Sequence, residues 1–249
     1  MKKKFTLIMY FLTFSAVFSQ ENTTSKPEDT EVWSPKPPIV IPSNESRAPS
    51  DAIVLLDGSS LSKWESTKDA SGPKWILNSD SSMTILPGTG SIQTKEKFGD
   101  VQLHIEWKSP IELEKTGQNR GNSGVFLQKR YEVQVLDNNS NDTYSNGQVA
   151  SIYKQSIPLA MASNKTGEWN SYDIIFHAPK FDPQGNRIKK GTITVLHNGI
   201  LVQDHYELEG TTEYIGQPKK VAHGEDSLEL QDHGSEVSYR NIWLRKLNE

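Results

Sequence analysis

The sequence contains no cysteine, and this absence excludes two kinds of chemistry. No disulfide can stabilise the fold, and no thiolate can act as a nucleophile or a metal ligand. Secreted animal domains often depend on disulfides, so a secreted chain without cysteine fits a bacterial periplasm better. A chain of this length can bury enough apolar surface to fold without cross-links.

The chain also lacks an apolar run long enough to cross a membrane. The longest run, Phe5–Phe18, has about 14 residues, whereas a spanning helix needs about 20. Lysines occupy positions 2–4 before it, and Val17 and Ser19 stand at the −3 and −1 positions of a cleavage site. We therefore predict a signal peptide over residues 1–19, no transmembrane segment, and a secreted protein of the bacterial periplasm.

Basic residues are few once the leader is removed. Without its three lysines, 24 Lys and Arg remain against 31 Asp and Glu, which gives a net charge of −7. Binding to nucleic acid requires a basic surface that neutralises phosphates. An acidic chain of this kind argues against a nucleic-acid partner.

No window of the sequence shows the 3.6-residue apolar spacing of an amphipathic helix. Short alternating segments separated by turn residues recur instead, and Asn198-Gly199 between two apolar pairs is a strong hairpin signal. We predict an all-β fold, a two-sheet antiparallel β-sandwich. The predicted strands are Ile53–Leu56, Trp75–Leu77, Met83–Leu86, Ser91–Thr94, Val101–Trp107, Gly124–Gln128, Tyr131–Leu136, Tyr172–His177, Gly191–His197, Ile200–Tyr206, Leu228–Leu230 and Val237–Arg245.

Two segments interrupt this rhythm. Residues 20–50 form a Pro-rich N-terminal extension before a single domain over residues 51–249; the extension is either disordered or packed in extended form on the domain. Asn138–Glu168 is a long segment that directly follows a strand, and long loops inside compact domains are often functional. We predict that it covers one face of the preceding strand.

The segment Asn122–Asp137 has the most informative pattern. Because strand side chains alternate, Val133 and Val135 point one way. Arg130, Glu132 and Gln134 point the other way. A row of cation, carboxylate and amide on an open face indicates a surface that holds a polar ligand.

The same segment can be compared with the E-x-D-x-x-E strand of retaining β-glucanases. Glu132 takes the first acidic position, Gln134 replaces the middle Asp, and Asp137 replaces the last Glu. A β-bulge after Val135 would bring Asp137 to the Glu132 face, at the separation that glycosidases use. Without the bulge, Asp137 simply begins a turn.

A second candidate group lies near the C-terminus, where Gln231 and His233 share a face opposite the apolar side chains of their strand. His233 is either a turn residue or a general acid or base near neutral pH. Glu106 shares a strand face with His104 beside Trp107. No pair has the spacing of a known metal motif, although a scattered His and Glu metal site stays open, and nucleotide and serine-hydrolase motifs are absent.

In combination, these residues resemble the 3-keto-disaccharide hydrolase domain, a family once catalogued as a domain of unknown function. The departures from its pattern are Gln128-Lys129, where the family often has a small pair, and Lys108 in place of Arg. The matching stretches are Ala52–Gly58 with Leu61 and Trp64, Leu103–Trp107, Gly121–Phe126, Arg130–Asp137, Gly147–Gln148, Ile152–Tyr153, Gly167–Trp169, Tyr172–Phe176, His197–Gly199, Leu230–Gly234 and Tyr239–Ile242.

The resemblance implies a concanavalin A-like sandwich that acts on glycosides already oxidised to a ketone at C3. One base removes the acidified C2 proton, the aglycone leaves by β-elimination, and water adds later. The partner would then be an oxidised (3-keto) carbohydrate or glycoside. As catalytic residues we predict Glu132 or His233 as the base, and Arg130 with Gln134 binding the enolate oxygen.

Further substrate contacts are predicted for Asn122, Gln231, Glu106, Tyr153 and Asp137. A divalent metal that polarises the ketone is a possible cofactor. Two alternatives remain at this stage, a non-catalytic carbohydrate-binding module and a conventional retaining β-glucanase that uses Glu132 and Asp137.

Overall fold

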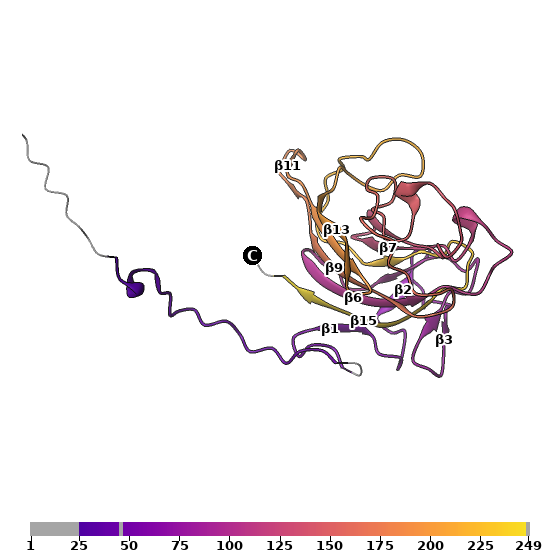
Figure 1. Ribbon diagram of the computed structural model, residues 1–249, viewed down its shortest axis with the longest axis horizontal. Coiled ribbons are helices and arrows are strands. Elements are labelled where there is room, and N and C mark those ends of the chain that lie inside the picture. The colour runs from indigo at the N-terminus through magenta and orange to yellow at the C-terminus, as the bar shows by residue number, and fades with distance from the viewer. Residues whose placement is uncertain (1–24, 45–46, 248–249) are drawn as a thin grey trace, which may run out of the picture. The chain divides into compact units, whose positions relative to one another are not determined.

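The computed structural model describes residues 25–44 and 47–247, so the predicted signal peptide lies outside the described residues (Figure 1). The chain divides into two units, the first ending at Ile39 and the second beginning at Val40. In the first unit, Pro27–Thr30 forms the short 3-10 helix η1. The Asp29 carboxylate accepts a hydrogen bond from the Lys26 amide at 2.9 Å, which closes the start of this helix.

The second unit contains an antiparallel sheet of eight strands. Seven of them run in the order β13-β12-β9-β6-β15-β4-β3, and β1 pairs with another part of β15. The bounds are β1 Ile53–Leu56, β3 Ile76–Leu77, β4 Met83–Thr84, β6 Val101–Lys108, β9 Asn170–His177, β12 Thr192–His197, β13 Ile200–Glu207 and β15 Ser238–Lys246.

A five-stranded antiparallel sheet forms the second layer, in the order β2-β5-β14-β7-β8. Its strands are β2 Trp64–Ser66, β5 Ile92–Thr94, β7 Ser123–Leu127, β8 Tyr131–Val135 and β14 Glu229–Leu230. A separate hairpin joins β10 Lys180–Phe181 to β11 Arg187–Lys189, and the short 3-10 helices are η2 Gly117–Asn119 and η3 Ser145–Gly147. No helix within residues 25–44 and 47–247 has the length and hydropathy needed to traverse a bilayer.

The predicted antiparallel β-sandwich is confirmed, and each predicted strand has an observed counterpart. The Asn198-Gly199 hairpin is present as well, with His197 opposite Ile200 and positive φ at both turn residues. Three strands were not predicted: β2, β10 and β11. They have two or three residues each, and alternation over so few residues identifies a strand in some cases, as for β3, β4, β5 and β14, and misses it in others.

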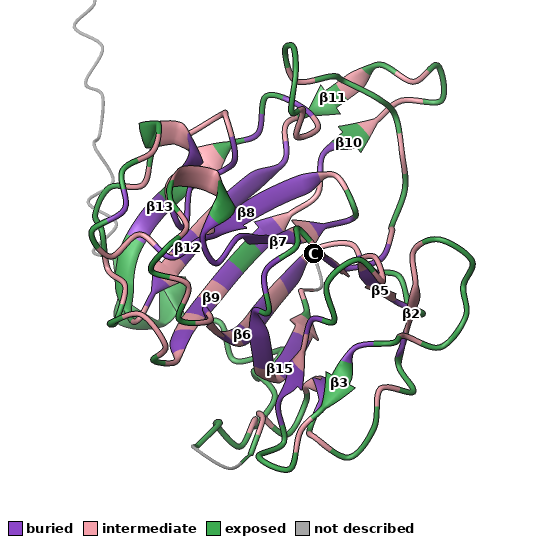
Figure 2. Cartoon of the chain, turned by 90° about the vertical axis from the view of Figure 1, so that its right-hand side faces the viewer, coloured by how far each residue is buried: buried purple, intermediate pink, exposed green. Residues whose placement is uncertain are grey.

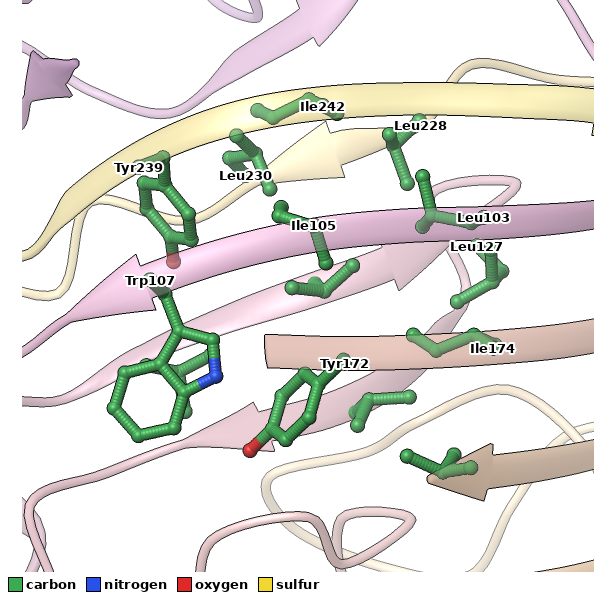
Figure 3. Packing of buried hydrophobic residues seen from close by; sticks show 14 of the residues in the cluster. Leu103, Ile105, Trp107, Leu127, Tyr172, Ile174, Leu228, Leu230, Tyr239 and Ile242 are labelled. Carbon is green, nitrogen blue, oxygen red and sulfur yellow. The ribbon is translucent and has the colours of Figure 1, made fainter. Parts of the chain in front are cut away.

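The core lies between the two sheets, where alternate side chains of each strand point inward (Figure 3). From the eight-stranded sheet come Leu103, Ile105 and Trp107 of β6 and Tyr172 of β9, all 0–1% exposed. Leu127, Leu228 and Leu230 meet them from the five-stranded sheet. Residues of even number on β8 therefore lie on the opposite face of that sheet, away from the core.

Strand β8 is nevertheless buried along its whole length (Figure 2). The loop after it returns beside its free edge: the Ala150 and Tyr153 amides donate to the Gln134 and Glu132 carbonyls at 2.9 and 3.1 Å, and Gln134 donates to Ser151. This pairing satisfies an edge that would otherwise be open. The face predicted to be open is thus covered, and part of the covering comes from the loop after residue 138.

Candidate active site

The hairpin β7–β8 sets the register of the candidate site. Gln128 and Lys129 form its turn with φ of 51° and 59°, and Gly124 and Phe126 of β7 stand opposite Gln134 and Glu132 of β8. Buried Gln128 donates to the Phe98 carbonyl at 2.9 Å, which anchors the turn. The register places Phe126, Glu132 and Gln134 together on the face that points away from the core.

A cavity of about 200 Å³ opens on this face. It collects side chains from the hairpin, from the segment after β14 and from the loops before β7, after β8 and after β13, so residues distant in sequence converge there. Its lining is Gln118, Asn122, Phe126, Glu132, Gln134, Tyr153, Thr212, Tyr214, Gln231 and His233. Six of these residues were predicted as site residues: Glu132, His233, Asn122, Gln134, Gln231 and Tyr153.

Glu132 is the ionisable group at the floor of the cavity, and it is only 4% exposed. Among the described residues, no group donates a hydrogen bond to its carboxylate, and its amide donates to the Thr212 hydroxyl at 3.0 Å. Burial, with a smaller contribution from the charge of Glu229, raises the pKa of Glu132 from 4.5 to about 8. A carboxylate destabilised in this way is a stronger base than an ordinary one.

Three amides beside Glu132 hold one another in a fixed orientation. Asn122 Nδ2 donates to the Gln118 carbonyl at 2.6 Å, and Gln118 Nε2 donates to the Gly147 carbonyl at 2.9 Å. The oxygens of both amides then accept from Gln134 Nε2 at 3.1 and 3.2 Å. Because backbone carbonyls fix the first two amides, Gln134 must present its nitrogen to them and its Oε1 elsewhere.

Aromatic side chains form one side of the cavity. Tyr153 is 8% exposed, and its hydroxyl lies 2.5 Å from that of Tyr144. The Lys154 ammonium lies 5.5 Å from the Tyr153 ring and 4.5 Å from the Tyr214 ring. Rings of this kind suit the CH faces of a sugar.

The opposite side is formed by the segment after β14. The Ser123 hydroxyl donates to the Gln231 carbonyl at 2.6 Å and accepts from Tyr239, which fixes the position of Gln231 relative to both sheets. Gln231 Oε1 is buried without a hydrogen-bond partner among the described residues. His233 lines the rim of the cavity, where its side chain is exposed.

Residues 51–245 match the family of 3-keto-alpha-glucoside-1,2-lyase-like domains. The chain belongs to this family. The resemblance found in the sequence is therefore confirmed, and a 3-keto-disaccharide hydrolase of Bacteroides thetaiotaomicron is 23% identical over 247 residues, covering 79% of this chain and 78% of the relative.

Two solved structures from Parabacteroides distasonis, both of candidate glycosyl hydrolases, share the fold. One is 49% identical with a TM-score of 0.85 and covers 89% of this chain and 97% of its own. The other is 18% identical with a TM-score of 0.59 and covers 80% of this chain and 94% of its own. At that lower identity the second structure supports the architecture alone.

The structure does not bring Arg130 into the cavity of this 3-keto-alpha-glucoside-1,2-lyase-like domain. Arg130 closes the hairpin turn, and its Nη1 donates to Asp226 Oδ2 at 2.6 Å and to the Gln128 carbonyl at 2.7 Å. The alternation rule fails here because residue 130 belongs to the turn and not to the strand. The predicted row of Arg130, Glu132 and Gln134 is corrected to the last two residues.

Asp137 is also placed elsewhere. The β7–β8 ladder ends at Val135, and the chain beyond it does not turn Asp137 toward Glu132. Its carboxylate is buried, accepting from Arg120 Nε at 2.8 Å and from the Thr166 hydroxyl at 2.9 Å. Asp137 is thus part of a structural ion pair and does not contact the cavity.

Glu106 lies on the outer face of the other sheet. Its carboxylate accepts from Arg240 Nε at 2.6 Å and from Asn241 Nδ2 at 2.8 Å, and it lies 3.7 Å from His104 Nε2. Burial by itself would lower the pKa of His104, but hydrogen bonds with Asp173 and Glu106 raise it to about 9. The sequence showed that Glu106 and His104 share a strand face, but it did not show that their strand, β6, belongs to the eight-stranded sheet.

Five polar or aromatic residues of this face were not predicted. Glu229 could have been found, because alternation after Leu228 places it on the same face as Gln231 and His233. It stands across β7 from Glu132, with Phe126 between them, and burial raises its pKa. Loops or neighbouring strands bring the other four, for which the local sequence gave no signal: Gln118, Phe126, Thr212 and Tyr214.

No group of three or more His, Asp or Glu side chains among the described residues is arranged to hold a metal ion. The cavity lining itself offers one carboxylate and one imidazole, Glu132 and His233.

Gly124→Ala is expected to lower kcat by about 100-fold, the effect of moving a catalytic group by about 1 Å. A Cβ at position 124 would lie 2.5 Å from Glu132 Oε1 and 2.7 Å from Cε2 of Phe126, so the carboxylate must shift. Gly72→Ala, where a Cβ meets nothing within 4 Å, is the matched control. Unchanged steady-state kinetics in a folded Gly124→Ala variant would contradict the importance of this position.

Proposed function

We propose that this cavity binds one sugar ring oxidised to a ketone at C3 and cleaves its glycosidic bond. The observation that carries the proposal is Glu132, a buried carboxylate with no hydrogen-bond partner among the described residues and a pKa raised to about 8, at the floor of a polar cavity. Membership of the family and the names of its relatives agree with this chemistry.

The size of the cavity agrees with a single ring. Ligand clefts usually enclose about 300–1,000 Å³. At about 200 Å³, this cavity suits one hexose with Phe126, Tyr153 and Tyr214 against its faces, and it does not accommodate a longer stretch of glycan.

The reaction needs one base, because the ketone makes the neighbouring C2 proton acidic. The Glu132 carboxylate removes that proton, and the electron pair passes to the C3 oxygen as an enolate. Return of the pair forms the C1–C2 double bond and breaks the bond from C1 to the aglycone oxygen, which takes up a proton. Water then adds at C1 and a proton returns to C2, so the net change is hydrolysis.

The remaining roles follow from which groups still have hydrogen-bonding capacity. Gln134 uses both amide hydrogens on Asn122 and Gln118, so it accepts from a substrate hydroxyl and does not donate to the enolate. The Thr212 hydroxyl accepts from the Glu132 amide and keeps its own hydrogen for the enolate oxygen. His233 at the rim protonates the leaving oxygen.

The test is a reaction in D2O with a 3-keto-glucoside, followed by release of the aglycone and by NMR of the sugar. Elimination and hydration should place deuterium at C2 of the released 3-keto sugar, and the matching unoxidised glucoside should remain intact. Release without deuterium at C2 would exclude the elimination route. Binding of glycans without turnover of any 3-keto substrate would identify a carbohydrate-binding module, and hydrolysis of unoxidised β-glucan would identify a conventional glucanase.

A further inference from the structure

A second hollow of about 430 Å³ lies beside the first cavity on the five-stranded sheet. Backbone, hydroxyl groups and one ammonium dominate its surface, and it contains no aromatic side chain. It is lined by Thr67, Lys68, Gly88, Gly90, Ser91, Asp232 and Gly234.

One short segment, residues 231–234, separates the two spaces. Gln231 and His233 line the first cavity, whereas Asp232 and Gly234 line the second. Gln231, Asp232 and His233 direct successive side chains to opposite sides, and Gly234, with positive φ, turns the chain after them, so a single stretch of backbone forms a thin wall. The two spaces are therefore one residue apart, and His233 stands at the exposed edge between them.

The wall is held rigidly from the second side. Asp232 Oδ2 accepts from the Gly90 amide at 2.9 Å, and its Oδ1 accepts from the Gly234 amide at 3.1 Å. The Asp232 amide in turn donates to the Ser91 hydroxyl at 3.2 Å. These bonds tie the wall to the β5 side of the sheet, so the distance between the two hollows is fixed before any ligand binds.

The donors of the second hollow suit a hydroxyl-rich group. The Lys68 ammonium has no carboxylate partner among the described residues, and it lies over Gly90, where an added Cβ would come within 3.0 Å of Nζ. Gly88, Gly90 and Gly234 leave the floor without projecting side chains, and all three have positive φ. A flat polar floor below a cationic donor matches a second sugar ring better than an aromatic aglycone.

We propose that the second hollow binds the leaving sugar of a 3-keto-disaccharide, with the scissile bond crossing the wall beside His233. The inference rests on the proposed function and adds to it the position of the leaving sugar and the residue that recognises it. In this arrangement Lys68 determines specificity: it donates to a hydroxyl of the leaving ring and does not touch the reacting atoms.

The experiment compares a 3-keto-disaccharide with methyl 3-keto-glucoside as substrates of the full chain and of Lys68→Met. We expect KM for the disaccharide to rise about tenfold, the usual effect of losing one hydrogen bond to a charged group, while the methyl glycoside is unaffected. Lys74 is an exposed lysine that does not line the hollow, so Lys74→Met should leave KM unchanged for both substrates. Free leaving sugar should also inhibit the parent chain more strongly than Lys68→Met.

An equal effect of Lys68→Met on both substrates, or no effect on either, would overturn the position of the leaving sugar. That result differs from failure of the proposed function, in which the parent chain itself releases product from neither 3-keto substrate.

Discussion

Glu132→Gln is expected to lower kcat/KM on a 3-keto-glycoside by about 10³-fold, within the range for loss of a general base. Gln has the shape of the protonated acid and cannot accept the C2 proton. The measurement is the initial rate of aglycone release by the variant under conditions in which circular dichroism shows a native fold. Glu114→Gln is the matched control, because it removes an exposed carboxylate that does not line the cavity.

The same substitution should stabilise the protein at alkaline pH. Folding raises the pKa of Glu132 from 4.5 to about 8, so the folded state holds this proton more tightly than the unfolded state. The contribution of this proton to the free energy of unfolding is fully present below pH 4.5 and is lost as the pH rises through 8. Because one pKa unit corresponds to about 1.4 kcal/mol, Glu132→Gln should gain several kcal/mol over the parent chain at pH 9 and little at pH 4.5.

Denaturant titrations at both pH values measure this difference. A variant that is less stable than the parent chain at pH 9, or one that retains full turnover, would contradict the assignment of Glu132 as a buried base. Loss of activity combined with a gain in stability is the expected sign of a site whose catalytic group is strained by its environment.

Arg120→Met should have the largest effect on stability, a loss of about 3–5 kcal/mol. The Arg120 and Asp137 side chains are 5% and 0% exposed, and their ion pair joins Nε to Oδ2 at 2.8 Å. Removing the guanidinium leaves a buried carboxylate without its counter-charge. Equilibrium unfolding in urea measures the loss, and the double variant with Asp137→Asn should recover much of it because the charge is then gone.

The single variant Asp137→Asn also distinguishes cleavage of a 3-keto-glycoside from the mechanism of a retaining glucanase. If Asp137 were the second acid of a retaining glucanase, turnover would disappear in a folded protein. We expect turnover on the 3-keto substrate to persist at temperatures where the variant is folded, since Asp137 bonds with Arg120 and Thr166 and not with the cavity. Loss of turnover without loss of structure would restore the glucanase interpretation.

Local alternation predicted part of the site correctly. It placed Glu132 and Gln134 on one face, and Gln231 and His233 on one face, and the structure brings all four into the same cavity. Alternation failed for Arg130, where the chain turns. For Asp137 the sequence left two positions open, and the structure places its carboxylate on Arg120 and Thr166, away from Glu132. It could not place Glu106, because a strand pattern does not state which sheet the strand joins.

The sequence by itself determined the all-β architecture, the family and the face on which Glu132 lies, because these depend on residue order and on a period of two. Only the tertiary structure decided that the Glu132 carboxylate is buried without a hydrogen-bond donor from the described residues, since Thr212, Tyr153 and His233 arrive from distant segments. Desolvation, which raises the pKa of Glu132 to about 8, is a property of packing and not of residue type. The wall between the two hollows depends on the same convergence, because Asp232 is fixed by the amide of Gly90, which precedes β5 and is far away in the sequence.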